Sequence, residues 1–354
     1  MPAQDNDSPR FDPALERYQK QILFAGIGEA GQQRLLRSSV LLVGCGALGS
    51  VIADQLGRAG VGRLRIVDRD FVETSNLQRQ VLYDEQDVAD QLPKAVAAAR
   101  KLARINSTVR VEPVVADVNR HNVLELMRGM DIVLDGTDNF ETRFLMNDAA
   151  LELGVPWING GCVGSHGQVM TIIPGRTACF RCLIPAAPQA GATETCDTAG
   201  VLASAVNVVS SLQVVDALKI LTGQSALIDN VLTVVDVWDG THRRLKLGDL
   251  SQTSGCPACQ GGERAWLRGE AGSQSTILCG RNAVQLAPAG NEQLSLEELA
   301  NRLRPLGAVS TNAYLVRFSV APYEMTVFKD GRAIVKGTED PAVARSLYAR
   351  YIGH

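Results

Sequence analysis

A glycine-rich segment near the start of the chain has the residue types and spacing of a phosphate-binding loop. It reads Gly44, Cys45, Gly46, Ala47, Leu48 and Gly49. An apolar run at 40–43, typical of a buried strand, precedes it, and a helical pattern at 48–59 follows. Glycines allow a tight turn and a close approach of the backbone, while amides at the start of a helix attract phosphate. The pattern alone fits NAD, FAD or ATP, and the alternative is a turn that binds nothing.

A mostly polar set of residues follows the next apolar runs in an arrangement that is unusual for a dehydrogenase. The set contains Asp68, Asp70, Glu73, Ser75, Asn76, Leu77, Gln78, Arg79, Gln80, Lys94, Asp138, Asn139 and Arg143. Asp68 could accept hydrogen bonds from ribose hydroxyls. Arg79 and Lys94 would bring two cations to the phosphates, and Asp138 could hold Mg²⁺. Such a set suits attack at phosphorus, where developing negative charge must be neutralised. Each residue alone could be a solvated surface charge, but ligands gather at the carboxyl ends of strands in open sheets.

Four cysteines form two CxxC pairs that could bind a metal ion. The pairs are Cys179 with Cys182 and Cys256 with Cys259. Together they supply four thiolates for tetrahedral Zn²⁺ and leave no open coordination position, which favours a structural zinc over a catalytic one. The long gap between the pairs requires the tertiary fold to bring them together. The alternatives are a redox-active CxxC or unpaired core thiols.

A fifth cysteine, Cys196, lies just before a long apolar pattern at 200–221. A helix N-terminus lowers the pKa of a thiol, so Cys196 is a candidate nucleophile. The alternative is a buried structural thiol. Three other cysteines fit core or turn positions, and the four histidines show no spacing typical of a metal site.

Strand and helix patterns alternate along most of the chain. After a helical lead-in at 10–33, strands are expected at 40–43, 64–67, 109–115, 132–134 and 156–159, with helical patterns between them. This alternation predicts an α/β fold with a Rossmann-like, doubly wound and mostly parallel sheet. We expect further strands at 169–173 and 231–237.

The composition changes after residue 260. Residues 1–260 are expected to form the nucleotide-binding domain, and 261–275, rich in Gly, Ser, Gln and charge, a linker. Residues 276–354 predict a small α+β domain with a hairpin at 325–336. This module could bind a partner or contact another subunit, or it could be a structural lid.

Charge and hydropathy set the expected location and partners. The net charge of −3 gives no basic field for nucleic acid or an anionic membrane. The N-terminus lacks the pattern of a signal peptide, and no apolar stretch is expected to reach the length that spans a bilayer. We therefore expect a cytoplasmic protein without nucleic-acid or membrane partners.

With these motifs in this order, residues from about 17 to 260 resemble the ThiF and MoeB adenylyltransferases, relatives of the ubiquitin-activating enzymes. The resemblance rests on Arg17-Tyr18-x-Lys20-Gln21, the 44–49 loop, the run 75–80, Pro93-Lys94, Gly136-Thr137-Asp138-Asn139, both CxxC pairs and Thr195-Cys196. It implies that the chain uses ATP to form an acyl adenylate on the C-terminal glycine of a small β-grasp sulfur-carrier protein ending in Gly-Gly. The carrier would then serve thiamine or molybdopterin synthesis, or related sulfur transfer.

The resemblance also implies roles for particular residues. The loop would back the nucleotide, Asp68 would hold ribose, and Asn76, Arg79 and Lys94 would address the phosphates. Asp138, with Asn139 beside it, would take part in Mg²⁺ binding. Cys196 matches a cysteine that some members link covalently to the activated carrier. Members that resemble this chain are usually homodimers.

The chain departs from the family pattern at several positions. Lys20 stands where an arginine often reaches the partner subunit's ATP, so the charge is kept but the bidentate fork is lost. Ala47 often aligns with a glycine, and the glycine often found two residues before Lys94 is absent. The region after 275 does not resemble a sulfurtransferase domain, so a separate sulfur donor is expected. The competing functions are a non-catalytic carrier-binding scaffold of the same fold and an NAD-dependent oxidoreductase.

The position of Cys196 separates two chemical steps. Cys196→Ala should retain carrier-dependent exchange between ATP and pyrophosphate, because adenylation needs no enzyme nucleophile, and it should lose any thiol-sensitive covalent link to the carrier. Isotope exchange and mass spectrometry under non-reducing conditions measure the two steps. Loss of exchange would place Cys196 in the adenylation site or the core, and sulfur delivery at the normal rate would leave it only structural.

Overall fold

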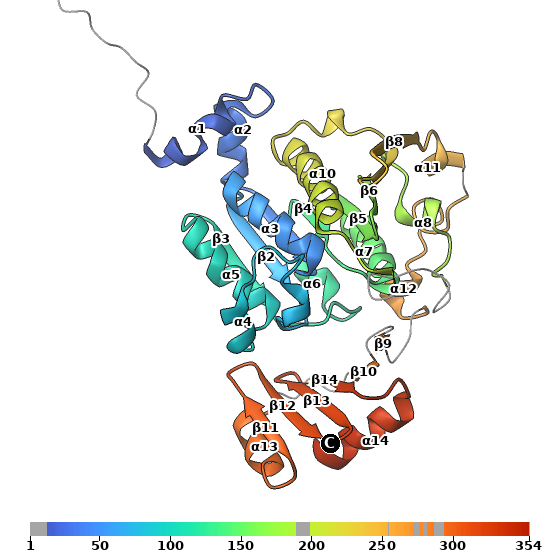
Figure 1. The fold of residues 1–354 in the computed structure, drawn as a ribbon. Helices are drawn as coiled ribbons and strands as arrows, with labels where there is room; N and C mark the ends of the chain where they lie inside the picture. Colours follow the sequence, from blue (N-terminus) through green and yellow to red (C-terminus); the bar gives the residue numbers. More distant parts are fainter. Residues whose placement is uncertain are drawn as a thin grey trace, which may run out of the picture.

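The fold is taken from a computed structural model that describes residues 13–188, 199–253, 255–271, 276–278, 282–286 and 294–353. Its larger part is built on one eight-stranded sheet (Figure 1). The strand order is β3-β2-β1-β4-β5-β6-β7-β8. The bounds are β1 (Ser39–Val43), β2 (Arg63–Val67), β3 (Arg110–Val114), β4 (Ile132–Asp135), β5 (Trp157–Val163), β6 (His166–Ile172), β7 (Val231–Asp236) and β8 (Thr241–Lys246). Strands β1 to β5 pair in parallel and β6 to β8 antiparallel, which confirms a parallel-dominated α/β sheet.

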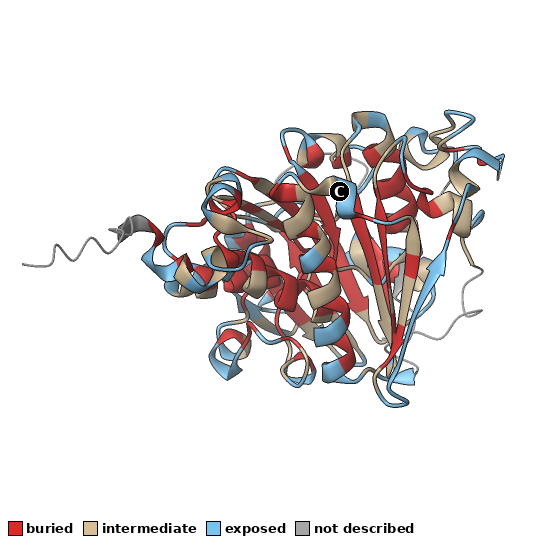
Figure 2. Ribbon diagram, turned by 90° about the horizontal axis from the view of Figure 1, so that it is seen from above, coloured by how far each residue is buried: buried red, intermediate tan, exposed pale blue. Residues whose placement is uncertain are grey.

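Helices cover both faces of this sheet because alternate side chains of each central strand point to opposite faces. In β1, Val40 and Leu42 join the core beneath α3, α5 and α10, while Leu41 and Val43 join the core beneath α6, α7 and α8. The helix bounds are α3 (Ala47–Ala59), α5 (Lys94–Ile105), α6 (Val123–Met127), α7 (Phe140–Leu153), α8 (Phe180–Leu183) and α10 (Ala203–Leu221). Figure 2 shows the central strands as the most buried layer.

Helix α10 lies within the apolar pattern at 200–221, but its length contradicts the expectation that no apolar stretch could span a bilayer. It has 19 residues, and its length and composition would allow it to cross a membrane. One side of it packs on α3, β5 and β6, with Val206, Val209 and Gln213 buried. On its other side Val208 and Val215 are exposed. The side of α10 that packs in the core accounts for part of its apolar composition. The exposed valines form an apolar strip on the opposite side.

The helical lead-in is broken into short pieces rather than forming one helix. Its described part consists of η1 (Pro13–Tyr18), α1 (Gln19–Ile22) and α2 (Gly28–Leu35). Tyr18 is buried, and its hydroxyl accepts a hydrogen bond of 2.9 Å from the side-chain amide of Asn106. The break falls just before Gly28, whose φ of +60 is left-handed.

Part of the segment predicted as a linker, 261–275, is packed against the larger domain. It contains α12 (Ala265–Arg268), and the Trp266 ring stacks on Phe144 with centroids 5.0 Å apart. The buried carboxylate of Asp148 accepts the backbone N–H of Trp266 at 3.0 Å. Aromatic stacking and this hydrogen bond outweigh the flexible composition that suggested a linker.

The C-terminal module is an antiparallel sheet with two helices. Its strand order is β11-β12-β13-β14-β10-β9. Its elements are β9 (Thr276–Leu278), β10 (Ala283–Leu286), α13 (Leu296–Leu303), β11 (Ala308–Thr311), β12 (Leu315–Val320), β13 (Tyr323–Phe328), β14 (Ala333–Lys336) and α14 (Pro341–Tyr351). The expected hairpin is present as β13 and β14, and the module has a hydrophobic core of its own.

Candidate functional site

The glycine-rich loop turns sharply from the end of β1 into α3. Gly44 has a φ of +84, and a Cβ there would lie 2.8 Å from the backbone of Gly136. A Cβ on Gly49 would lie 2.0 Å from the carbonyl oxygen of Gly44. At Gly46 the nearest atom to such a Cβ is 3.9 Å away. Gly44 and Gly49 are therefore required by packing, whereas Gly46 leaves open space over the amides that begin α3 at Ala47.

The Asp68 carboxylate holds this loop from the end of β2. It is buried and accepts the backbone N–H groups of Cys45 at 2.6 Å and of Asp70 at 2.7 Å. Burial raises the pKa of Asp68, against the lowering effect of the Lys94 charge. A carboxylate has about four acceptor positions, so Asp68 can still accept a ribose hydroxyl.

Lys94 lies beside the same loop, at the first position of α5 after Pro93. Its side chain is buried and its Nζ is 3.3 Å from Oδ2 of Asp70. Its backbone N–H donates to the Asp70 carbonyl at 2.9 Å. The structure therefore brings together the loop, Asp68 and Lys94, which lie far apart in the sequence.

Tyr83 connects the loop to Lys94 and was not singled out by the sequence patterns. Its buried hydroxyl lies 2.7 Å from the carbonyl oxygen of Cys45 and 3.2 Å from that of Lys94. Burial raises the pKa of Tyr83, which keeps the phenol protonated as a donor. In the sequence, the only sign of Tyr83 is its position 11 residues before Lys94. That spacing belongs to no known motif, so it could not identify the residue.

The polar run after β2 has mixed roles. Asn76 is buried at the end of η2 (Thr74–Asn76), and its Oδ1 accepts the Glu73 N–H at 3.2 Å. Arg79 donates to the Ser75 carbonyl at 2.8 Å. Leu77 packs against the core and Gln78 is exposed. Among these residues Asn76 and Arg79 have side chains that could address phosphates.

Next to this run lies an acidic edge around Arg69. Its guanidinium is 3.1 Å from Asp117. Burial by itself would lower the pKa of Arg69, but the carboxylates of Asp117, Asp70, Asp138 and Asp68 together raise it. Carboxylates are oxygen ligands of the kind that Mg²⁺ prefers, but among the described residues only the four cysteines form a group of three or more ligand atoms that all lie within 4.8 Å of one another.

The loop that carries Asp138 is fixed by a buried ion pair. Arg143 Nε donates to Asp135 Oδ2 at 2.8 Å, and its Nη2 donates to the carbonyls of Thr137 and Gly160. Asn139 caps α7, since its side chain accepts the Glu141 N–H at 2.8 Å. Capping uses the Asn139 oxygen and leaves Asp138 as the metal-binding candidate of this loop.

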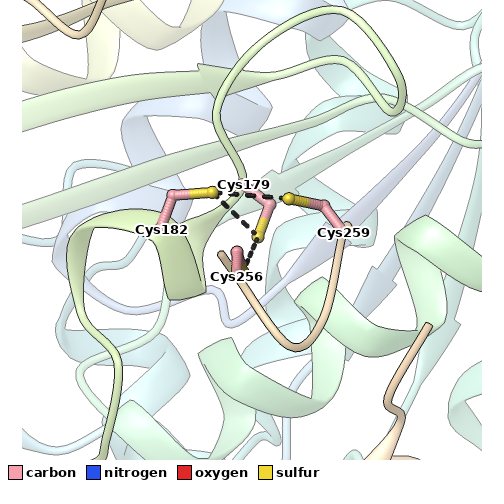
Figure 3. A group of neighbouring side chains, drawn as sticks. All are labelled: Cys179, Cys182, Cys256 and Cys259. Atoms are coloured by element: carbon pink, nitrogen blue, oxygen red, sulfur yellow. Dashed lines mark hydrogen bonds between the residues drawn. The ribbon is translucent and has the colours of Figure 1, made fainter. Parts of the chain in front are cut away.

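The four cysteines of the CxxC pairs form one cluster (Figure 3). Cys179 and Cys182 come from the start of α8, and Cys256 and Cys259 follow α11 (Leu250–Thr253). Their sulfurs are 3.6 Å apart for Cys179–Cys256, 3.8 Å for Cys179–Cys182 and 3.4 Å for Cys182–Cys259. Four sulfurs each about 2.3 Å from a tetrahedral zinc lie about 3.8 Å apart. The cluster therefore fits one metal ion of this kind.

The sequence profile of the ThiF family matches residues 18–258. The chain belongs to the ThiF family. This confirms the resemblance inferred from the motifs, and the match covers the loop, the acidic edge and three of the four clustered cysteines.

Two curated relatives are similar to this chain over most of their own length. The sulfur carrier protein ThiS adenylyltransferase of Bacillus subtilis is 45% identical over 338 residues, which cover 95% of this chain and 99% of that protein. The sulfur carrier protein adenylyltransferase of Thermus thermophilus is 40% identical, covering 69% of this chain and 90% of that protein. The first alignment covers 95% of the 354 residues, so it must extend past residue 275 into the C-terminal module.

Solved structures share the fold. Escherichia coli MccB in its crystal structure with ATP has a TM-score of 0.60 and 24% identity, covering 69% of this chain and 74% of that one. At this identity the likeness concerns the fold.

The structure does not test the roles that the ThiF family resemblance gives to Cys196 and Lys20. Cys196 lies outside the described residues. Lys20 is exposed on α1, and its expected role concerns a second subunit.

Two glycines of the ThiF loop should respond differently to substitution. Gly49→Ala should lower the free energy of unfolding by about 1–3 kcal/mol or more, since its methyl group would overlap backbone. Gly46→Ala should have a much smaller effect on stability but weaken ATP binding, because its methyl group would occupy the open space over the amides. Urea unfolding and ATP titration measure both quantities. Equal stability losses in the two variants would contradict this account of the loop.

Proposed function

We propose that this ThiF-family protein uses ATP to adenylate the C-terminal glycine carboxylate of a small β-grasp sulfur carrier and releases pyrophosphate. The observation that carries the proposal is the 45% identity to a ThiS adenylyltransferase across 99% of that protein. The convergence of the loop, Asp68 and Lys94 supports ATP as the nucleotide. The carrier would end in Gly-Gly and serve thiamine synthesis or molybdopterin-type sulfur transfer, with sulfur from a separate donor protein.

In the proposed reaction the carrier carboxylate attacks the α-phosphorus of ATP and the bond to pyrophosphate breaks. The start of α3 binds phosphate oxygens through its amides, and Asp68 accepts from the ribose. Lys94 and Arg79 offset the negative charge that develops during transfer, and Asn76 donates to phosphate. Asp138 and the neighbouring carboxylates would bind a Mg²⁺ ion that arrives with ATP, and such an ion would supply positive charge next to the phosphates.

Two other functions fit part of these observations. An NAD-dependent oxidoreductase would use the glycine loop but needs neither the Lys94 cation nor the acidic edge. A carrier-binding scaffold of the same fold would need no phosphate cations. Neither is favoured by a specific contact, and binding of NAD in preference to ATP would revive the first.

The exposed strip on α10 supports a homodimer. Val208 and Val215 border a shallow hollow with Leu212. A second copy packed there would remove these side chains from water. In such a dimer the family resemblance gives Lys20 a place at the partner's nucleotide. A solution mass of one chain, measured by sedimentation, would contradict the dimer.

We also propose the cytoplasm as the location of the enzyme.

The phosphate cations give the direct test of the function. Lys94→Ala or Arg79→Ala should reduce carrier-dependent ATP–pyrophosphate exchange by about a hundredfold or more, the usual effect of removing one preorganised donor. Arg100→Ala, on the exposed side of the same helix as Lys94, is the matched control and should exchange normally. Near-normal exchange in both Lys94→Ala and Arg79→Ala would refute the assignment.

We propose that the cysteine cluster holds one structural Zn²⁺ per chain. Elemental analysis of the reduced protein should find one zinc, and Cys182→Ser should lose it together with thermal stability, because metal binding contributes folding free energy. Cys162→Ser, outside the cluster, should keep the metal. Purified protein without zinc would overturn the proposal.

A further inference from the structure

The C-terminal module contacts the segments that carry the nucleotide site. Phe71, three residues after Asp68, is only 5% exposed because Leu315, Phe328 and Ile334 of the module enclose it. Figure 1 shows the module beside α4 (Glu85–Ala89), at the lower end of the larger domain in that view. The Phe71 segment therefore belongs partly to the core of the module.

This segment is bonded directly to the backbone that leads into Lys94. Phe71 forms a β-bridge with Pro93, and the Val72 N–H donates to the Leu92 carbonyl at 2.9 Å. On the other side of the bridge, the Lys94 N–H donates to the Asp70 carbonyl. A shift of Phe71 would thus be transmitted through these two backbone hydrogen bonds to the first residue of α5.

The module also supports a strained turn just before this pairing. Gln91 has a φ of +50, a left-handed conformation that is unfavourable for a residue with a side chain. The Asn312 side-chain amide donates to the Gln91 carbonyl at 2.9 Å, and the Ser310 hydroxyl lies 3.2 Å from the Gln91 side-chain oxygen. The module thus supplies side-chain contacts at a turn where the chain has glutamine rather than glycine.

A second contact acts on the other side of Phe71. Lys336 Nζ is 2.7 Å from Oε1 of Glu73 and 5.8 Å from the centroid of the Phe71 ring. Glu73 begins η2, where it forms a reciprocal capping pair with Asn76. Both side chains of the ion pair are about one-third exposed, so solvent weakens their electrostatic attraction. The pair therefore matters mainly because it fixes the position of Glu73 at the start of η2.

We propose that the C-terminal module is a positioning element of the adenylation site, in which Asn312 fixes the turn that presents Lys94 and Lys336 fixes the cap that presents Asn76. The proposal rests on the proposed function, because it assumes that these two side chains bind ATP. It assigns the module a role in nucleotide binding rather than in recruitment of the carrier.

The test compares ATP binding with carrier binding in the full-length protein. Asn312→Ala and Lys336→Met should each raise the ATP Kd without carrier, and the ATP KM in pyrophosphate exchange, by about fivefold, as expected for one lost hydrogen bond. The carrier KM should stay unchanged. Asn301→Ala, exposed on α13 of the same module, is the matched control, and Lys336→Arg should restore ATP binding.

Amide hydrogen exchange supplies a readout that a general loss of stability would not reproduce. Peptides covering 71–80 and 88–95 should exchange faster in the two variants, while peptides from β5 and β6 keep their rates and the thermal midpoint is unchanged. The two substitutions lie in separate segments, so a folding defect in one leaves the other as the test.

The outcomes distinguish this proposal from the function on which it rests. A wild-type protein that binds no ATP, or shows no exchange with any Gly-Gly carrier, would defeat the proposed function. Wild-type activity with an unchanged ATP Kd in both variants would defeat the positioning role alone. A raised carrier KM with unchanged ATP binding would overturn it in favour of recruitment.

Discussion

The nucleotide site depends on how closely the backbones of Gly49 and Gly136 approach the carbonyl oxygen of Gly44. A Cβ on Gly49 would lie 2.0 Å from the Gly44 oxygen, and one on Gly136 would lie 2.4 Å from it. The start of α3 therefore meets the ends of β1 and β4 with no side chain between them. This contact places the phosphate loop directly beside the Asp138 loop. Asp68 then ties the phosphate loop to β2 through the Cys45 amide.

Helix α7 connects this site with the cysteine cluster. At its N-terminus Asn139 caps the helix beside Asp138, and the Arg143–Asp135 pair anchors its first turn in the sheet. Midway along the helix, the Asn147 side-chain oxygen accepts the N–H of Phe180 at 2.9 Å, and Phe180 lies between Cys179 and Cys182. Breaking a buried pair such as Arg143–Asp135 is costly, so this pair holds the first turn of α7 firmly to the sheet. A structural metal at the cysteines would thus support the geometry of the nucleotide site.

The sequence predicted those features whose cause is local. Glycine spacing between a strand and a helix gave the loop, and the paired CxxC motifs gave all four clustered cysteines. Tyr83 could not be found this way, because its role comes from two carbonyls that meet only after folding. The antiparallel edge strand β8 was also missed, since its residues are all exposed and lack the alternation of a half-buried strand. The packing of α12 depended on Phe144 and Asp148, which are distant in sequence. The domain boundaries remain predictions.

The turn at Gln91 explains why a module outside the ThiF match can matter to the site. A glycine would adopt the left-handed conformation without cost, but this chain has a glutamine at position 91. A residue with a side chain holds such a conformation only where its surroundings fix it. Those surroundings are Asn312 and Ser310 on one side and the Phe71 bridge on the other. A catalytic domain with this loop sequence therefore depends on the module for the orientation of Lys94, and loss of the module would leave the turn without its supporting hydrogen bonds.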